Sequence, residues 1–430
     1  MKKIGLTTST ALIAGNMIGS GIFLLPATLA ALGGISFLGW ACSTAGAFLL
    51  VLLFRGLSEL FPNVVGGPYA YTRAVLGDFF GFLVGWGYWI SVWCTNAAIA
   101  VAFVGYLTVF IPQIAHNPYL AISFGLGALW LFSILNFRDI VFVGQIQKVS
   151  TVLKIFPLLL IGFVGLFYVD WSLLRFDNLS GESGFKAISQ ATTLTLFAYL
   201  GIETASITSH KINHSSDTVG RAGIIGFCLT AVVYILCSLV IFGLISTSKL
   251  SQSTAPFVEA SAVFLGGYAQ KFVAFAALIA TLGALNGWIL IQGQIAYALA
   301  QDNMFPSFFK KLNKSQAPYL GIVISSTLAS ILLLTKFSDS LIDVFSFMMN
   351  LSTLSALTPY LLSAVSLFLY VRHKKGKVLV LQLVAIFSGL FCLWMMYGVG
   401  LETVLLGAVL LFLGVFLYVF KKFYEKNTRR

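Results

Sequence analysis

Residues 15–23 read Gly-Asn-Met-Ile-Gly-Ser-Gly-Ile-Phe, in the middle of the first long apolar run of the chain, residues 6–32. Three glycines within seven residues disfavour a continuous helix there, because each costs about 1 kcal/mol of helix propensity relative to alanine. In a lipid bilayer, the backbone N–H and C=O groups that a break frees must find other partners. The stretch therefore predicts a broken membrane helix whose break faces a protein cavity or holds a ligand.

A second apolar run is interrupted five predicted spans later. Residues 197–206 read Phe-Ala-Tyr-Leu-Gly-Ile-Glu-Thr-Ala-Ser, with a glycine and a carboxylate inside a hydrophobic segment. Two interrupted spans at corresponding places in two halves of a chain are typical of the midplane binding site of a secondary transporter. The two stretches together predict such a site.

The composition excludes a water-soluble globular protein. Of the 430 residues, 59% are hydrophobic and 9% are charged, and the apolar runs repeatedly reach the roughly 20 residues that cross a bilayer. The first run follows Met-Lys-Lys, as in a signal peptide, but it is too long and lacks a cleavage site, so we expect it to remain as a span. The cysteines lie within apolar runs without metal-ligand spacing and predict neither a disulfide nor a metal site: Cys42, Cys94, Cys228, Cys237 and Cys392.

The apolar runs predict an all-α polytopic membrane protein with twelve spans. The longest polar loops, residues 169–185 and 301–318, are too short for a separate soluble domain. The predicted spans are residues 5–31, 35–60, 79–112, 118–137, 147–168, 186–209, 221–246, 269–300, 319–336, 340–371, 377–398 and 401–421.

The basic residues predict the orientation of these spans. With the N-terminus in the cytoplasm, twenty lysines and arginines lie on the cytoplasmic side and five lie outside. By the positive-inside rule, both termini are then cytoplasmic. The same distribution accounts for the net charge of +12 without a nucleic-acid partner.

Two ionisable residues lie inside predicted spans, and each has two interpretations. Glu203 is the carboxylate that lies deep within a span, and it either belongs to an ion or proton pathway or is a structural acid that caps broken-helix backbone. Lys154 lies about a third of the way into the fifth span. It either snorkels to the inner surface or changes charge during transport.

The break in the first span suits the recognition of an amino acid. After Gly19 a half-helix restarts, and the free N–H groups and positive dipole end at Ser20 and Gly21 favour a carboxylate. The unwound carbonyls of Met17 and of residues 197–200 suit an ammonium group. Opposite charges recognised at adjoining breaks predict an α-amino acid as the substrate.

Aromatic and polar side chains in the middle of predicted spans are further candidate site residues. Trp288 follows Asn286 and Gly287 far from either membrane interface, and Asn96 lies halfway along the third span. Tyr88 and Phe197 are further aromatic candidates in the third and sixth spans. The sequence has no phosphate-binding loop, nucleophile motif or metal-ligand cluster, so it predicts neither a cofactor nor a metal and disfavours an ATP-driven pump or a membrane enzyme.

Six motifs are distributed over nearly the whole chain: residues 15–26, 66–71 (Gly-Gly-Pro-Tyr-Ala-Tyr), 197–206, 255–257 (Ala-Pro-Phe), 287–300 and 302–306 (Asp-Asn-Met-Phe-Pro). Jointly they resemble the amino acid–polyamine–organocation superfamily. Within it the sequence is most similar to the bacterial basic amino acid/polyamine antiporters, such as the arginine–agmatine exchanger.

This resemblance implies a LeuT-type fold. Ten core helices form two inverted five-helix repeats, spans 1 and 6 are broken, and two extra helices follow. The implied domains are residues 1–168 for the first repeat, 186–371 for the second, and 377–430 for the extra spans with a basic tail.

The resemblance also implies roles for the site residues. The backbone N–H groups of Ser20 and Gly21 are expected to bind the substrate carboxylate, and its α-amine is expected at the carbonyls of Met17, Phe197 and Leu200. Trp288 is expected to stack along the substrate, with Asn96 near its distal end and Tyr88 helping to close the extracellular side. Glu203 matches a glutamate implicated in acid-dependent gating.

Two residues depart from the arginine exchanger. Phe197 stands where that protein has a tryptophan that covers the substrate, and phenylalanine stacks less well on a guanidinium group. Lys154 stands where the exchanger is apolar, whereas other members of the superfamily have a lysine there that ties span 1 to span 8 in place of a sodium ion. Both departures favour a neutral substrate or proton coupling over strict arginine specificity.

The sequence therefore predicts a secondary-active amino acid transporter of a bacterial inner membrane. Exchange of amino acids or amines, preferably cationic, by alternating access is the first hypothesis, and proton-coupled symport with broader or neutral specificity is the alternative. The predicted partners are the small-molecule substrate and the lipid bilayer, while protons and a homodimer stay open. A channel lacks the continuous polar pore lining it would need, and a scaffold has no use for two broken helices.

Overall fold

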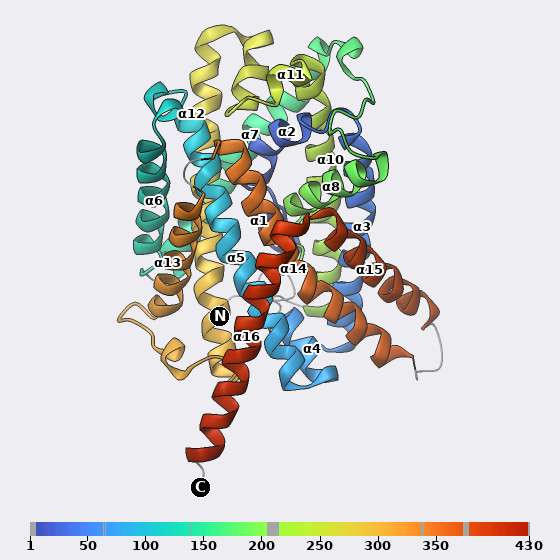
Figure 1. The fold of residues 1–430 in the computed structure, drawn as a ribbon, viewed down its shortest axis with the longest axis vertical. Helices are drawn as coiled ribbons and strands as arrows, with labels where there is room; N and C mark the ends of the chain where they lie inside the picture. Colours follow the sequence, from blue (N-terminus) through green and yellow to red (C-terminus); the bar gives the residue numbers. More distant parts are fainter. Residues whose placement is uncertain are drawn as a thin grey trace.

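The computed structural model describes residues 6–62, 64, 66–138, 140–203, 215–336, 339–372 and 378–428. Within these ranges every regular element is a helix, which confirms the all-α prediction (Figure 1). Among the described residues, eight helices are long and apolar enough to cross a membrane, whereas the count of twelve spans stays a prediction. The spanning segments lie in α3 (Ser36–Leu60), α5 (Asp78–Leu107), α6 (Pro118–Leu135), α10 (Ser215–Leu244), α12 (Pro256–Gln301), α14 (Leu341–Val371), α15 (Leu379–Gly398) and α16 (Leu401–Thr428).

The first apolar run forms two helices, α1 (Leu6–Met17) and α2 (Ser20–Ala30). Gly19 lies between them in an extended conformation, with φ −127° and ψ −149°. The N–H of Ile18 still donates to the carbonyl of Ala14, at 2.8 Å. The predicted break in the first span is therefore confirmed, and it falls directly before Ser20.

The sixth predicted span is also interrupted. Its first half is α8 (Gly184–Ala198), which ends inside the apolar run. The chain then turns, with the N–H of Leu200 donating to the carbonyl of Phe197 at 3.1 Å. Gly201 has φ +105°, in the left-handed region that glycine adopts at little cost. The break is confirmed, but residues 204–214, and with them the rest of the predicted span 186–209, lie outside the described residues.

α5 lies at the centre of the bundle. It packs against α12 and α14, and also against α6, α13 (Tyr319–Thr335) and α4 (Pro68–Leu76). Each interrupted span has a long uninterrupted neighbour, because α1 packs on α10 and α8 packs on α3. α7 (Ile140–Gly165) packs on α12. This packing brings the two breaks to opposite sides of one small region beside α5.

α12 contains two helical segments. Gly266 interrupts the helical geometry with φ +71° and ψ 179°, a conformation that residues with a Cβ rarely adopt. Pro256–Gly266 is therefore a separate short apolar helix ahead of the spanning segment Gln270–Gln301.

A loop between α7 and α8 fixes the turn between α2 and α3. This loop contains η2 (Leu166–Tyr168) and η3 (Trp171–Leu173). The N–H of Gly34 donates to Asp177 Oδ1 at 3.1 Å, and the N–H of Ile35 donates to the carbonyl of Asp177 at 3.0 Å. A Cβ on Gly34 would lie 1.6 Å from the carbonyl oxygen of Arg175, so only glycine permits this close approach.

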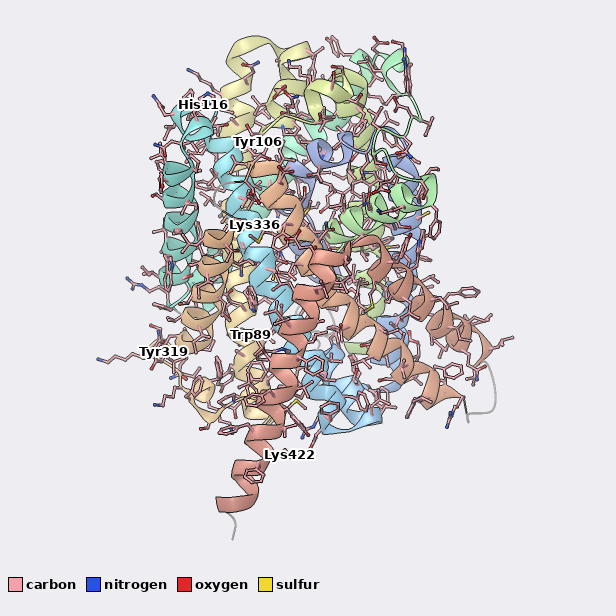
Figure 2. All side chains as sticks on the ribbon, viewed as in Figure 1. Trp89, Tyr106, His116, Tyr319, Lys336 and Lys422 are labelled. Atoms are coloured by element: carbon pink, nitrogen blue, oxygen red, sulfur yellow. The ribbon has the colours of Figure 1, made fainter. Side chains whose placement is uncertain are left out.

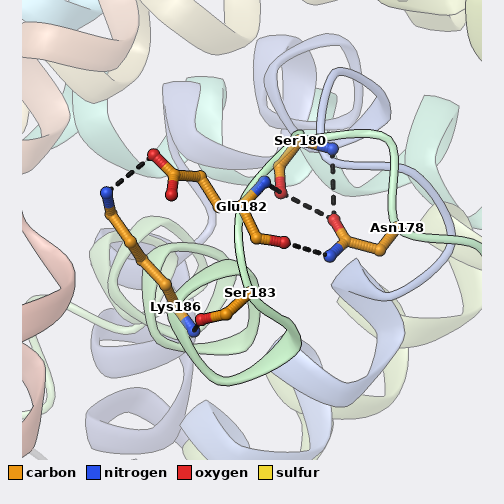
Figure 3. Close-up of polar contacts among 5 residues, drawn as sticks. All are labelled: Asn178, Ser180, Glu182, Ser183 and Lys186. Carbon is orange, nitrogen blue, oxygen red and sulfur yellow. Dashed lines mark hydrogen bonds and ion pairs between the residues drawn. The ribbon is translucent and has the colours of Figure 1, made fainter.

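The end of the same loop caps α8 (Figure 3). Ser183 Oγ accepts the N-cap hydrogen bond from the N–H of Lys186 at 3.4 Å. Asn178 Oδ1 accepts from the N–H of Ser180 at 3.1 Å, and Asn178 Nδ2 donates to the carbonyl of Glu182 at 2.8 Å. The Lys186–Glu182 ion pair, 2.6 Å long, is exposed and adds at most about 1 kcal/mol. The start of the helix that carries the second break is thus held by local hydrogen bonds.

The two ends of the molecule are distinct (Figure 1). α4 and the C-terminal end of α16 lie at the lower end, and α11 (Thr247–Leu250) lies at the upper end. In the predicted orientation, with a cytoplasmic C-terminus, the lower end is the cytoplasmic one.

Candidate functional site

A small cavity lies between the two breaks. Its volume is about 10 Å³, room for about one water molecule, and its side chains are no more than 5% exposed. The cavity is therefore closed in this structure. The cavity is lined by Met17, Gly19 and Gly21 of the first break, Phe197, Ala198 and Leu200 of the second, Thr95 of α5 and Trp288 of α12.

The start of α2 offers backbone donors to this cavity. α2 begins at Ser20 with Gly19 as N-cap, and no side chain caps it. The N–H groups of its first turn, including those of Ser20 and Gly21, have no partner inside the helix, and they carry the positive end of the helix dipole. A Cβ on Gly21 would lie 3.2 Å from the Cα of Ala198. α2 therefore approaches α8 as closely as a glycine allows.

The end of α1 is held by two donors from other helices. Its last carbonyls lack partners inside the helix. The hydroxyl of Tyr234, from α10, donates to the carbonyl of Met17 at 2.5 Å, and the ammonium of Lys154, from α7, donates to the carbonyl of Gly15. The Met17 carbonyl, predicted to receive the substrate amine, thus already accepts one hydrogen bond. A carbonyl oxygen has a second lone pair for another donor.

Lys154 does not snorkel to the membrane surface. Its side chain is 0% exposed, and its positive charge lies at the negative dipole end of α1, where a cation is stabilising. Its hydrogen bond joins α7 to α1. α7 also packs closely on α12, because a Cβ on Gly283 would lie 2.3 Å from the Cβ of Ser150.

Glu203 is buried between two tyrosines. The hydroxyl of Tyr88, from α5, donates to Oε1, and the hydroxyl of Tyr360, from α14, donates to Oε2 at 2.6 Å. The sequence analysis missed Tyr360. Its position directly after Pro359 in mid-span was the available signal. Among the described residues, no group of three or more His, Cys, Asp and Glu side chains could hold a metal ion.

Tyr88 lies on the part of α5 that leads from the cavity toward α4. Figure 2 shows its neighbour Trp89 in the lower part of the molecule, on the side of Lys422 near the C-terminus. The predicted orientation makes this the cytoplasmic side of the cavity. Tyr88 lies about two turns of α5 from Thr95, and its role in closing the extracellular side stays a prediction.

Asn96 does not line the cavity, whereas its neighbour Thr95 does. Asn96 Nδ2 donates instead to Gln292 Oε1 at 2.8 Å, and Gln292 Nε2 donates to Ser326 Oγ at 2.8 Å. Thr95 Oγ1 lies 2.7 Å from Ser352 Oγ. Thr95 of α5, paired with a hydroxyl of α14, thus lines the cavity at the depth where the sequence predicted an amide.

Aromatic side chains lie on the side of the cavity opposite to α4. Phe23 lies next to Tyr106 and Phe257, with ring centroids 5.7 and 5.2 Å away. The hydroxyl of Tyr106 donates to the carbonyl of Phe23 at 2.7 Å, and Figure 2 shows Tyr106 in the upper part of the molecule. Phe197 makes an edge contact with Phe345 of α14 at 6.3 Å. The sequence analysis did not identify the cluster of Phe23, Tyr106 and Phe257.

Comparisons with known proteins give matches over nearly the whole chain. A family model described as amino acid permease matches residues 4–420. The cadaverine/lysine antiporter of Escherichia coli (strain K12) is 28% identical over 433 residues, 99% of this chain and 96% of that protein. The arginine/ornithine antiporter of Pseudomonas aeruginosa is 30% identical over 439 residues, 97% of this chain and 90% of that protein. The putrescine transporter PotE of Haemophilus influenzae is 30% identical over 422 residues, 97% of each.

Proposed function

Because the chain belongs to the amino acid permease family, a family of membrane transporters and not of enzymes, we propose that it exchanges a cationic amino acid for an amine across a bacterial inner membrane. One structural observation carries this proposal: the two helix breaks face each other across one buried cavity. The relatives named as a cadaverine/lysine antiporter, an arginine/ornithine antiporter and a putrescine transporter support the cationic substrate class.

The backbone of the breaks recognises the α-amino acid group. The substrate carboxylate binds the N–H groups of Ser20 and Gly21, where the α2 dipole adds favourable electrostatic energy. The ammonium group binds the carbonyls of Phe197 and Leu200 and the second lone pair of Met17. Because backbone groups, and not side chains, bind the α-amino acid group, the site suits amino acids with different side chains.

The side chain of the substrate lies between aromatic rings. Trp288 and Phe197 are both in the cavity wall, and an aromatic face attracts a desolvated cation by about 2 kcal/mol. Thr95 offers a polar contact at the distal end. The cavity must widen before a substrate enters, because its present volume is about 10 Å³.

Glu203 and its two tyrosines form the gate on the side of α4. Both tyrosine hydroxyls donate to the carboxylate, so a proton taken up by Glu203 weakens these bonds, because they lose their anionic acceptor. Protonation of Glu203 at low pH would in this way favour opening of the gate. The alternative function, proton-coupled symport, is favoured by Lys154, a fully buried cation bonded to the end of α1.

The two halves form inverted repeats, residues 1–168 and 186–371, followed by the extra spans in residues 377–430. The reciprocal packing of α1 on α10 and of α8 on α3 supports this arrangement. Rocking of these four helices against α5, α6, α12 and α13 opens the cavity to either side. Both termini are cytoplasmic, and a homodimer is the oligomeric state to test by light scattering.

Radiolabelled arginine uptake into proteoliposomes tests the exchange. Vesicles are loaded with ornithine, with putrescine or with buffer, and uptake is measured at two external pH values. Uptake that requires an internal substrate is expected. Uptake that is driven by external acid and occurs in buffer-loaded vesicles would mean that the protein is a proton symporter and not an exchanger. If arginine is not taken up under any condition, lysine, ornithine and a panel of neutral amino acids are tested in the same way, and uptake of neutral amino acids alone would contradict the cationic substrate class.

A further inference from the structure

The loop between α7 and α8 presents exposed aromatic side chains at the upper end of the molecule (Figure 1). Phe167 is 87% exposed, Trp171 is 65% exposed and Phe176 is 74% exposed. Aromatic side chains carry a large apolar surface that is favourable to remove from water. A group of such rings on one surface marks a contact with a membrane or with another protein.

The exposure of these rings is not the result of a loosely attached loop. The N–H of Asp170 donates to the carbonyl of Gly243, near the end of α10, at 2.8 Å. Cγ1 of Val169 lies 2.6 Å from the place of a Cβ on the same Gly243. The ring of Tyr168 stacks on Phe264 of α12, with the ring centroids 5.5 Å apart. The loop is therefore packed on α10 and α12, and it holds the exposed rings at defined positions.

The exposed rings continue the lipid-facing row of α7, which contains the predicted fifth span. Phe163 of this helix is 57% exposed, and it lies about one helical turn before Phe167. Leu159 is exposed as well, and α10, which packs on α7, exposes Leu229 and Val232. Exposed apolar side chains along spanning helices face lipid. The aromatic surface of the loop is thus continuous with a surface that lies against the bilayer.

Phe176 extends the aromatic surface to the other side of α10. Its ring contacts Phe37 of α3, with the centroids 6.1 Å apart. Phe37 in turn contacts Phe242 of α10 at 5.2 Å. The rings of the loop therefore lie on both sides of the upper end of α10, near the level where this helix ends.

Charged side chains limit how deeply the loop can enter a membrane. Asp170 and Arg175 are exposed, and they alternate along the loop with the aromatic residues. A charge in the hydrocarbon core costs several kcal/mol, whereas water alone would leave the rings hydrated. The headgroup region accommodates both kinds of side chain, and tryptophan and tyrosine are enriched there.

We propose that residues 166–176 lie in the membrane interface at the upper end of the molecule, with the rings of Phe167, Trp171 and Phe176 inserted between lipid headgroups. The partner of this surface is the bilayer itself. Asp177 of the same loop bonds to the turn between α2 and α3, and Ser183 caps α8. The interface therefore fixes the height of these three helices in the bilayer.

The depth of single spin labels tests this placement. The full-length protein without its five native cysteines receives one label at Phe163, Phe167, Trp171 or Glu182 and is reconstituted into liposomes. Relaxation of the label by oxygen is compared with relaxation by a water-soluble nickel chelate. The labels at 167 and 171 are expected about 5–10 Å into the headgroup–acyl boundary, and the label at 163 up to about 6 Å deeper. Glu182, an exposed residue later in the same loop, is expected to give a label in water.

A matched pair of variants tests whether the rings hold the loop at this depth. A label at Ser172 leaves every ring in place and serves as the reporter. Phe167→Ser with Trp171→Ser is expected to move this reporter into water, with loss of its preference for oxygen. The control is Tyr119→Ser, which removes a similarly exposed ring from the start of α6. It is expected to leave the depth of the reporter unchanged.

Three outcomes would overturn the placement. Nickel accessibility at 167 and 171 equal to that at 182 would mean that the loop lies in water. Spin–spin broadening between identical labels that persists on dilution with lipid would assign the surface to a second copy of the chain. An equal shift of the reporter in the double variant and in the control would mean a general effect on the protein. Size-exclusion elution reports the folding of each variant, and Trp171→Ser alone, with a smaller shift expected in the same direction, replaces the double variant if that one does not fold.

Discussion

Backbone atoms and side chains have different tasks at the cavity. In the proposed function, the charged α-amino acid group binds the N–H groups of α2 and the carbonyls of the second break, which no side-chain substitution removes directly. Trp288, Phe197 and Thr95 shape the remaining wall. Substitutions of these three side chains therefore report on side-chain selectivity, and not on amino acid binding as such.

Trp288→Ala is expected to weaken binding of a cationic substrate by roughly five- to thirtyfold, the equivalent of about 1–2 kcal/mol for a desolvated cation–aromatic contact. A neutral amino acid such as alanine is expected to lose less, because its side chain offers no cation. Isothermal titration of the purified protein measures both affinities. Equal losses for the two substrates would make Trp288 a packing residue.

Glu203→Gln is expected to flatten the pH dependence of transport while substrate affinity changes little, because the amide cannot take up the proton that disturbs the tyrosine hydrogen bonds. Tyr360→Phe removes one donor, worth about 1 kcal/mol net, and keeps the carboxylate. It is expected to shift the pH profile without flattening it. Exchange rates between pH 5 and pH 8 distinguish the two variants, and an unchanged profile in Glu203→Gln would exclude this residue as the pH sensor.

At the scale of helices, local sequence was sufficient to predict both breaks: three glycines in the first stretch, and one glycine with a carboxylate inside an apolar run in the second. The rotation of each helix was not predictable in the same way. Thr95 and Asn96 are neighbours, but successive residues on a helix point about 100° apart, and only the first lines the cavity. Tyr360 was missed for the same reason: Pro359 beside it marks the position in the sequence, but its contact with Glu203 depends on how α14 packs.

Gly21→Leu is expected to abolish exchange while the protein still inserts into the membrane. A side chain here meets Ala198 and Phe197 at 3.2–3.4 Å, so it separates α2 from α8 and fills the cavity. Gly127→Leu is the control, because a Cβ on Gly127 of α6 has no atom within 4 Å. Uptake and membrane abundance are measured for both variants. Normal uptake by Gly21→Leu would mean that the break in the first span is not part of the transport site.

Lys154→Met keeps most of the side-chain volume but leaves the carbonyl of Gly15 without its ammonium donor. Loss of a cation at a helix C-terminus costs up to about 2 kcal/mol. We expect the exchange rate to fall at least tenfold, with a smaller change in affinity, because α1 is no longer tied to α7 as it moves. Exchange kinetics and binding are measured on the same preparation. An exchange rate equal to that of the unchanged protein would mean that Lys154 contributes only to packing and not to transport.

At the scale of the whole molecule, the cavity is closed on both sides. Tyr88, Glu203 and Tyr360 lie on the side of α4, and Phe23, Tyr106 and Phe257 lie on the opposite side. The loop before α8 adds a physical link, since Asp177 bonds to the turn between α2 and α3. α2, α3 and α8 are therefore coupled at the upper end, and we expect them to move as one body.

Spin labels test this coupled motion. Cysteines replace Tyr119 at the start of α6 and Glu182 before α8, both exposed, in a chain whose five native cysteines are alanine. We expect two distances between these labels that differ on the order of 5 Å, with populations that change when a saturating substrate is added. A control pair at Tyr119 and Ile331, on α6 and α13, is expected to give one constant distance, because both helices belong to the static body. A single distance for the first pair, unaffected by substrate, would contradict rocking of α2, α3 and α8 against α6 and would require a gate that opens by local side-chain movement alone.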